Sequence, residues 1–389
     1  MNSIFFLEWK SFGNTYIIKA FENSGYTVEC FPFPRDTEDV RFSAGLTEQL
    51  AKEIMEKQPA FVFSYNYFPV AAIACKACRV KYVSWVYDSP YILLYSQTVF
   101  YETNRIFIFD RSEAEKIRQL GAKHVYYLPL AAAVTDYDTK IPSPTQQKEY
   151  ESDVTFIGSM YSETKQHMFR HLERLDDYTR GYLFGLMGAQ KNLYGIDILE
   201  ETLTPEIVES MRKVCPVTEH GDGIETVEWV FANYFLARKV TAMERYEILD
   251  RLSRICDVKL FTPEKTPLLT RVKNMGKIDY YDEAPCAMKC AKINLNISLR
   301  SIHSGMPLRA LDILGCGGFL LTNFQSDFLE FFEPGVDFVY YENSSDIEKL
   351  VSYYLEHEEE RKQIAANGYR KVKEWLTYEK QVAKMLNLI

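Results

Sequence analysis

Short apolar runs alternate with amphipathic stretches along the first third of the chain. The runs have the β-branched and aromatic character of strands and cover 3–9, 26–33, 60–66, 81–87, 105–110 and 124–130. Between most of them the apolar positions recur at helical spacing, as in 14–25 and 46–57. Such alternation predicts a parallel sheet covered by helices. Because ligands bind beyond the carboxyl ends of the strands in these sheets, the loops 10–14, 65–69 and 87–90 are candidate site segments.

A polar segment with two prolines, 136–152, interrupts this pattern and predicts a linker. A new strand begins at 153, and a helical stretch of about 163–255 without a clear strand follows it. The alternation then resumes at 257–263. We therefore predict an α/β protein with two doubly wound, Rossmann-like domains, 1–135 and 153–370, that face a central cleft. The stretch of about 163–255 is expected to be a helical insertion in the second domain.

The stretch HSGMPLRALDILGCGG, 303–318, predicts a short helix between two strands of the second domain. Pro307 suits the first helical position, so the helix would point unpaired amides at the loop 301–306, as a phosphate site requires. Arg309 and Asp312 are three residues apart and share one side of the helix, where they could bind a ligand or simply form an internal ion pair. The glycines that follow, Gly317 among them, permit a tight turn and close approach of a ligand to the backbone.

Composition and charge exclude several classes of partner. The chain has 389 residues, and 54 acidic against 45 basic residues give it a formal charge of −9. No basic block suggests nucleic-acid binding, and no apolar run approaches the ~20 residues that span a bilayer. The first residues, MNSIFFLEW, lack the basic start of a signal peptide. We expect a soluble, cytoplasmic protein of unknown oligomeric state that binds no nucleic acid.

The sequence offers only weak candidates for a metal site. Cys75 and Cys78 lie in an apolar helical run without a second pair of matching spacing, and Cys286 and Cys290 are one helical turn apart. His167 and His171 are four residues apart but have no third ligand nearby in sequence. Buried thiols and an exposed helix face explain these residues better, so no metal is predicted.

Asp88 is the acid best placed for chemistry in the first half. It follows the strand-like run 81–87 and precedes Ser89 and Pro90. At such a strand end a carboxylate could accept a proton from an attacking hydroxyl group. The alternative is a turn-forming aspartate that caps the segment after Pro90.

The stretch SGMPLRALDILGCGGFLLTN, 304–323, resembles the donor-binding motif of GT-B glycosyltransferases. Many retaining members of that fold have a glutamate, seven residues, a second glutamate and an Ala-Cys-Gly turn; here Ser304 and Asp312 stand at the glutamate positions. Together with FIGSMY, KINLNISL and the final YEKQVAKML, the chain more closely resembles the CgeB-like spore-maturation branch, a bacterial-type family. The likeness spans most of the chain apart from the helical insertion. It implies a GT-B fold with a last helix, 371–389, that crosses back to the first domain.

The resemblance also implies roles for individual residues in binding a nucleotide sugar. Asp312 would accept hydrogen bonds from the ribose hydroxyls. Ser159 stands where the family often carries an arginine for the diphosphate, and Lys165 lies near the family's lysine, so Arg309 or Arg300 is expected to supply the missing charge. Further residues are expected to surround the donor sugar, its phosphates or its base: Gly158, Ser304, Gly305, Tyr280 and Gly317. Tyr280 could equally be a packing aromatic, and His303 could donate a proton to the leaving phosphate or be a plain loop residue.

These expectations describe a hexosyltransferase-like glycosyltransferase. It would move a sugar from a nucleoside diphosphate donor, preferably a UDP-sugar, to a hydroxyl group of a glycan or protein, without a metal or a permanently bound cofactor. One alternative is a nucleotide-sugar epimerase or hydrolase on the same fold. Another is a non-catalytic, coat-associated protein that binds sugar nucleotides, which the serines at 159 and 304 favour.

Overall fold

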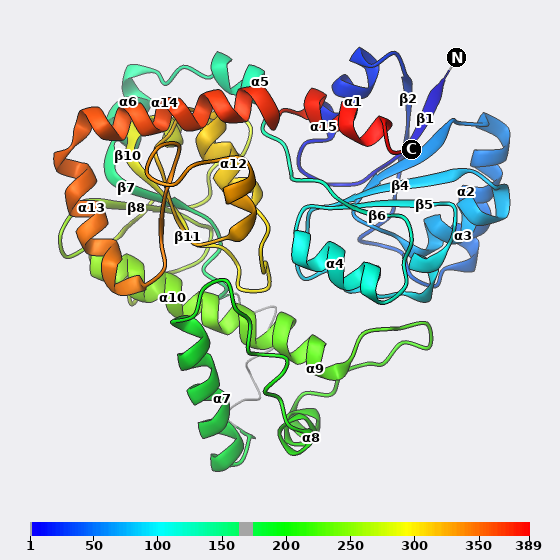
Figure 1. Ribbon diagram of the computed structural model, residues 1–389, viewed down its shortest axis with the longest axis horizontal. Helices are drawn as coiled ribbons and strands as arrows, with labels where there is room; N and C mark the ends of the chain where they lie inside the picture. The colour runs from blue at the N-terminus through cyan, green and yellow to red at the C-terminus, as the bar shows by residue number, and fades with distance from the viewer. Residues whose placement is uncertain (1, 163–173) are drawn as a thin grey trace. The chain divides into compact units, whose positions relative to one another are not determined.

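The computed structural model describes residues 2–162 and 174–389, which form two compact units (Figure 1). Unit 1 comprises Met1–Ala133, Glu219–Glu225 and Trp375–Ile389, and unit 2 comprises Val134–Thr218 and Thr226–Glu374. None of the described helices is both long and apolar enough to cross a membrane.

Unit 1 contains a six-stranded sheet in the order β2-β1-β3-β4-β5-β6, and all its neighbouring strands run parallel. Its elements are β1 (Ser3–Glu8), α1 (Asn14–Asn23), β2 (Thr27–Pro32), α2 (Ala44–Lys57), β3 (Phe61–Tyr65), α3 (Pro69–Cys78), β4 (Lys81–Val86), β5 (Asn104–Ile108), α4 (Arg111–Gln119), β6 (Val125–Tyr127) and α15 (Tyr378–Leu386). The central strands are buried along almost their whole length, because helices cover both faces of a parallel sheet.

Residues 375–389 complete unit 1. Helix α15 packs beside α1, the red and blue helices of Figure 1. Ala132 donates a backbone hydrogen bond of 2.9 Å to Leu376, and the rings of Tyr16 and Tyr378 lie 5.4 Å apart. Gly13, at φ +84°, lies so close to the Tyr378 hydroxyl that a Cβ atom would stand 2.3 Å from it, so no larger residue fits there.

Unit 2 contains a second parallel six-stranded sheet, in the order β12-β11-β10-β7-β8-β9. Its elements are α5 (Val134–Thr139), α6 (Pro144–Tyr150), β7 (Ser152–Ile157), α7 (Asp177–Lys191), α8 (Pro205–Val214), α9 (Val227–Val230), a π-helical turn (Phe231–Leu236), α10 (Ala237–Leu252), β8 (Val258–Phe261), β9 (Lys273–Asn274), α11 (Ala284–Cys290), β10 (Ala291–Asn296), α12 (Leu308–Gly315), β11 (Leu320–Asn323), β12 (Val339–Tyr341), α13 (Ile347–Glu356) and α14 (Glu358–Trp375). The fold prediction of two doubly wound sheets with flanking helices is confirmed.

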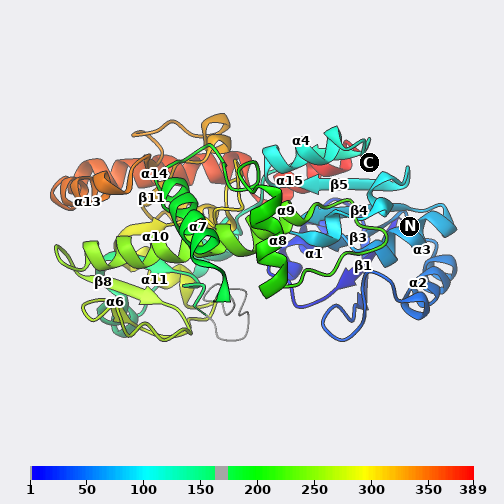
Figure 2. The ribbon, with the colours of Figure 1, turned by 90° about the horizontal axis from the view of Figure 1, so that it is seen from below.

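Two predicted boundaries differ from the structure. The segment 136–152, expected as a linker, contains α5 and α6 and belongs to unit 2. The helical stretch expected at 163–255 has no strand in its described part, but its last helix is not an insertion. Helix α10 lies alongside the sheet, and its Ile248, Leu249 and Leu252 are buried in the core of unit 2, whereas α7 and α8 extend away from the sheet (Figures 1 and 2).

Candidate functional site

Helix α12 and the loop before it form the first part of the candidate site. Pro307 has an extended backbone and immediately precedes the helix, whereas it was predicted at the first helical position. Its carbonyl accepts a hydrogen bond of 3.0 Å from the amide of Ala310. The helix buries Leu311 and Leu314 completely, so its polar residues are placed by a fixed apolar face.

Asp312 lies on the buried side of α12, with 2 % of its surface exposed. Its Oδ1 accepts hydrogen bonds from the hydroxyls of Tyr137, at 2.6 Å, and Tyr280, at 3.2 Å. Its Oδ2 lies 3.5 Å from Nη1 of Arg309, and neither of these two buried atoms makes a hydrogen bond within the described part of the chain. Burial raises the pKa of Asp312, against the opposing effects of the Arg309 charge and the two tyrosine hydroxyls. Arg309, Asp312 and Tyr280 are thus brought together.

The segment after β11 donates hydrogen bonds to the backbone of the loop 301–306. The carbonyl of Ser304 accepts a hydrogen bond of 3.0 Å from Asp327, and that of Ile302 accepts one of 3.1 Å from Gln325. Ser304 and Gly305 are buried within this loop. These hydrogen bonds fix the backbone conformation of the loop.

His303 of the same loop has an acidic neighbour that the sequence did not reveal. Its Nε2 lies 3.2 Å from Oδ2 of Asp197, in the segment between α7 and α8. Oδ1 of Asp197 accepts a hydrogen bond of 3.0 Å from the amide of Leu199, which fixes the carboxylate. This contact places a carboxylate beside the imidazole ring of the loop.

The loop after β7 surrounds an internal carboxylate, Glu264. Ser159 Oγ donates to it at 2.5 Å, the amide of Met160 at 2.5 Å and the amide of Ser162 at 2.7 Å. Burial acts to raise the pKa of Glu264, but the hydrogen bonds from the serines and amides outweigh it, and the pKa is lowered. These amides, next to Gly158, therefore already bind an anionic group. Lys165, His167 and His171 lie outside the described residues.

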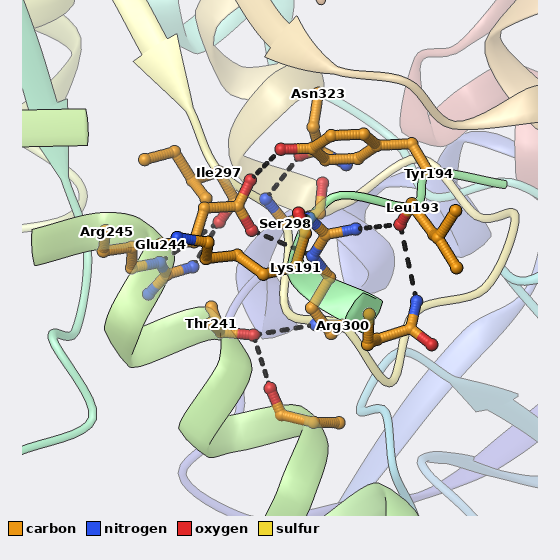
Figure 3. Close-up of polar contacts among 12 residues, drawn as sticks. Lys191, Leu193, Tyr194, Thr241, Glu244, Arg245, Ile297, Ser298, Arg300 and Asn323 are labelled. Carbon is orange, nitrogen blue, oxygen red and sulfur yellow. Dashed lines mark hydrogen bonds and ion pairs between the residues drawn. The ribbon is translucent and has the colours of Figure 1, made fainter. Parts of the chain in front are cut away.

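The side chain of Arg300 is buried among partners within unit 2. Its Nε lies 2.9 Å from Oε2 of Glu244, and its other nitrogens donate to the carbonyls of Leu193, at 2.8 Å, and Lys191, at 2.9 Å (Figure 3). The side chains of Arg300 and Glu244 are 7 % and 1 % exposed. Lys191 ends α7, so the guanidinium group satisfies carbonyls that a helix end leaves unpaired. Arg300 thus fastens α7 to α10, and its predicted role in binding diphosphate does not agree with this geometry.

Helix α10 fixes the carboxyl ends of the unit-2 strands through two further residues. Thr241 Oγ1 accepts a hydrogen bond of 2.9 Å from the amide of Arg300. Arg245 donates from Nε to the carbonyl of Ile297 at 3.2 Å (Figure 3). Its Nη1 donates to the carbonyl of Ser159, so Arg245 ties the loops after β10 and β7 together. Sequence reasoning missed these residues, because they lie in a stretch that was predicted as a separate insertion.

Gly317 is not brought to the ligand side of α12. It follows the helix at φ +76°, as a tight turn into β11 requires. A strand–helix–strand crossover returns the chain to the opposite edge of the sheet, so the turn after α12 and the loop 301–306 lie at opposite ends of an eight-residue helix, about 12 Å long. Its expected contact with a ligand is therefore corrected to a structural role.

Asp88 of unit 1 directly follows β4 and Tyr87. Its Oδ2 accepts a hydrogen bond of 2.7 Å from Nδ2 of Asn66. Burial raises the pKa of Asp88, and the Asn66 hydrogen bond and the Arg35 charge oppose this shift. The segment that follows is a short 3₁₀ turn that begins at Ile92 without a side-chain cap, so Asp88 does not cap it.

The described residues contain no group of three His, Cys, Asp or Glu side chains placed to hold a metal ion. Cys75 and Cys286 are buried, Cys78 and Cys290 are partly buried, and burial raises the pKa of all four thiols.

Comparisons with known proteins define the class of fold. The chain is similar over its whole length to three solved structures at 10–12% identity: HepE of Anabaena in complex with UDP-glucose, a glycosyltransferase from Rickettsia africae and sucrose-phosphate synthase from Thermosynechococcus elongatus. The TM-scores are 0.57, 0.54 and 0.52, and the match covers 100% of this chain and 100%, 97% and 98% of the respective relatives. The chain has the two-domain GT-B fold.

The second half of the chain also matches a family by sequence. Residues 243–387 match the profile of the family described as Glycosyl transferase-like. A sequence comparison with curated proteins finds no match. The matched range contains Arg309, Asp312 and the loop 301–306.

Proposed function

We propose that the chain is a glycosyltransferase of the CgeB-like type, with a nucleoside diphosphate sugar bound in unit 2 and a hydroxyl-bearing glycan or protein acceptor bound in unit 1. The observation that carries the proposal is the Arg309–Asp312 pair on α12 behind the loop 301–306. The family match of 243–387 and the similarity to HepE, a protein crystallised with UDP-glucose, support a UDP-sugar as the donor.

In this proposal different side chains bind different parts of the nucleotide sugar. Asp312 Oδ1 is occupied by two tyrosine hydroxyls, and Oδ2 is the atom that accepts hydrogen from the ribose hydroxyls. Arg309 gives its guanidinium group to the diphosphate, a pairing that its planar fork suits. Ser304 and Gly305 lie against the sugar and phosphates, and Tyr280 lies beside the base.

In this proposal the transfer inverts the anomeric carbon, without a metal; in a transfer that retains the configuration, Asp88 would only orient the acceptor. The acceptor oxygen attacks while Asp88 takes its proton, and the diphosphate leaves with the electron pair of the broken bond. His303, held by Asp197, donates a hydrogen bond or a proton to the departing phosphate oxygen. The burial that raises the pKa of Asp88 makes it a stronger base than an exposed aspartate.

Titration calorimetry with UDP tests the donor site. Asp312→Ala and Arg309→Ala should each weaken UDP binding roughly 10–150-fold, because a hydrogen bond to a charged group contributes about 1.5–3 kcal/mol. The matched control is Asp250→Ala, which removes a surface partner of Arg254 in the same unit and should leave the affinity unchanged. Equal UDP affinity in the wild type and both site variants would contradict the assignment.

Turnover separates this function from the alternatives. The wild type, incubated with a panel of nucleotide sugars, should release nucleoside diphosphate faster when an acceptor is added. Release that ignores acceptors indicates a hydrolase, and a changed sugar without release indicates an epimerase. Tight UDP binding without any chemistry indicates a non-catalytic binding protein. The carboxylate of Glu264, which the loop after β7 binds, and the serines at 159 and 304 favour this reading.

A further inference from the structure

Asn66 occupies an unusual place at the end of β3. It is completely buried, and its backbone has φ +57°, a left-handed conformation that asparagine tolerates better than most residues. Its amide donates a hydrogen bond of 2.9 Å to the carbonyl of Trp85 in β4. This hydrogen bond fixes the backbone of Asn66 next to β4, and with it the position from which the side chain extends.

The side-chain amide of Asn66 can point in only one direction. Its Oδ1 accepts hydrogen bonds from the backbone amides of Tyr87, at 3.1 Å, and Asp88, at 3.3 Å. Two donors must face an oxygen, so the amide cannot be flipped and Nδ2 must face Asp88. At 2.7 Å it binds Oδ2 of that carboxylate.

The consequence for Asp88 is an asymmetric carboxylate. Oδ2 is held by Asn66, whereas Oδ1 accepts no hydrogen bond from the described residues. The charge of Arg35 also acts on Asp88. The guanidinium carbon of Arg35 lies 4.3 Å from the centre of the Trp9 ring, and its Nη1 lies 3.2 Å from Oδ1 of Asp36. Trp9 in turn stacks on Tyr87 at 6.2 Å and 12°, which supports the segment that carries Asp88.

We propose that Asn66 is a positioning residue that holds one oxygen of Asp88 and presents the other to the acceptor hydroxyl. The proposal rests on the proposed function. Oδ1 accepts the acceptor proton as the new bond to the anomeric carbon forms and the bond to the diphosphate breaks. Asn66 touches neither substrate and acts by restricting the rotation of the carboxylate and by stabilising its charged form.

The test is Asn66→Gly, because glycine adopts the left-handed backbone freely and lacks the side chain that holds Asp88. Turnover should fall roughly 10–150-fold, the equivalent of one hydrogen bond to a charged group. Losing a donor to the carboxylate raises the pKa of Asp88 further, so the acidic limb of the turnover–pH profile should move to higher pH. UDP affinity and the KM for the donor should stay unchanged.

Arg79→Gly is the matched control, since Arg79 has the same φ of +57° but is exposed at the end of α3. If glycine at 66 lowers stability too far, Asn66→Ser repeats the test, because its hydroxyl is too short to reach Asp88. An active wild type whose Asn66 variants keep the rate and pH limb of the Arg79 control overturns this proposal alone. A wild type that binds UDP but transfers no sugar overturns the proposed function, and this proposal with it.

Discussion

The carboxyl edges of the two sheets share a topology but use their carboxylates differently. In unit 1, Asp88 has one amide donor from Asn66 and no cation in contact among the described residues, and burial raises its pKa. In unit 2, Glu244 has the guanidinium group of Arg300 at 2.9 Å and the Tyr194 hydroxyl at 2.5 Å. The charge of Glu244 is balanced by a buried guanidinium group, whereas the carboxylate of Asp88 is held by a neutral amide. The residue type alone therefore does not separate a reactive acid from a structural one.

The two edges also differ in what holds them together. The edge of unit 2 is tied by helix α10, whose Thr241 and Arg245 bind the loops after β10 and β7. The edge of unit 1 is tied by the side chain of Asn66, by the indole N–H of Trp9, which donates to the carbonyl of Tyr65 at 3.1 Å, and by ring contacts between Trp9, Tyr87 and Tyr65. We therefore expect substitutions at the unit-2 edge to change stability and substitutions at the unit-1 edge to change the rate.

The largest effect is expected from Glu244→Ala. It leaves Arg300 buried without its counter-charge, which should reduce the free energy of unfolding of unit 2 by about 3–5 kcal/mol. Hydrogen exchange analysed by peptide reports each unit separately and should show the loss in unit 2. The control is Glu348→Ala, whose partner Arg251 is more exposed and whose loss should be at most about 1 kcal/mol. If both variants lose a similarly small free energy of unfolding, the buried Arg300–Glu244 pair does not stabilise the edge of unit 2 as expected.

Asp88→Asn should lower turnover and leave stability nearly unchanged, the reverse of Glu244→Ala. It retains the size of the side chain, so unit 1 should stay folded, but turnover should fall roughly 10²–10⁴-fold because basicity is lost. In the wild type, turnover should fall as the pH drops through the pKa of Asp88, which burial places above the ordinary aspartate value. The variant should lack that acidic limb and retain UDP affinity. A loss under tenfold in turnover would rule out a base at this position.

The smallest effect is expected from Gly317→Ala, at the amino edge of the unit-2 sheet. A side chain at φ +76° should destabilise unit 2 by about 1–2 kcal/mol. Since Gly317 lies at the far end of α12 from the loop 301–306, calorimetry should give an unchanged UDP affinity. Exposed Gly181→Ala within α7 serves as the comparison, because helix propensity predicts a slight gain in stability there. A loss of UDP affinity in Gly317→Ala would show instead that Gly317 contributes to ligand binding.

The sequence predicted the fold well because each strand and helix has a local pattern. The amphipathic helix expected at 46–57 appears as α2, with Leu46, Leu50 and Ile54 buried. Met55, an apolar residue of the same helix, points outward and is 68 % exposed. Local periodicity was sufficient for these elements, since it depends on neighbours within two helical turns.

The site was less predictable, because its polar partners are distant in sequence. Arg300 had the right charge for a diphosphate, but its partner Glu244 lies 56 positions earlier in a helix without any motif. Asp197 and Glu264 reach His303 and Ser159 from segments that carry no signature of a site. The Arg309–Asp312 contact was predictable, because three residues separate them on one helix.

The place of α15 in unit 1 has a consequence for how the chain is made. The ribosome synthesises β1 to β6 first, then unit 2 together with residues 219–225 of unit 1, and only then residues 375–389. At 5–20 residues per second, roughly 10–50 s separate β6 from α15. During that interval the surfaces of Gly13 and Tyr16 that receive Tyr378 stay uncovered. The first unit to be synthesised is therefore the last to finish folding.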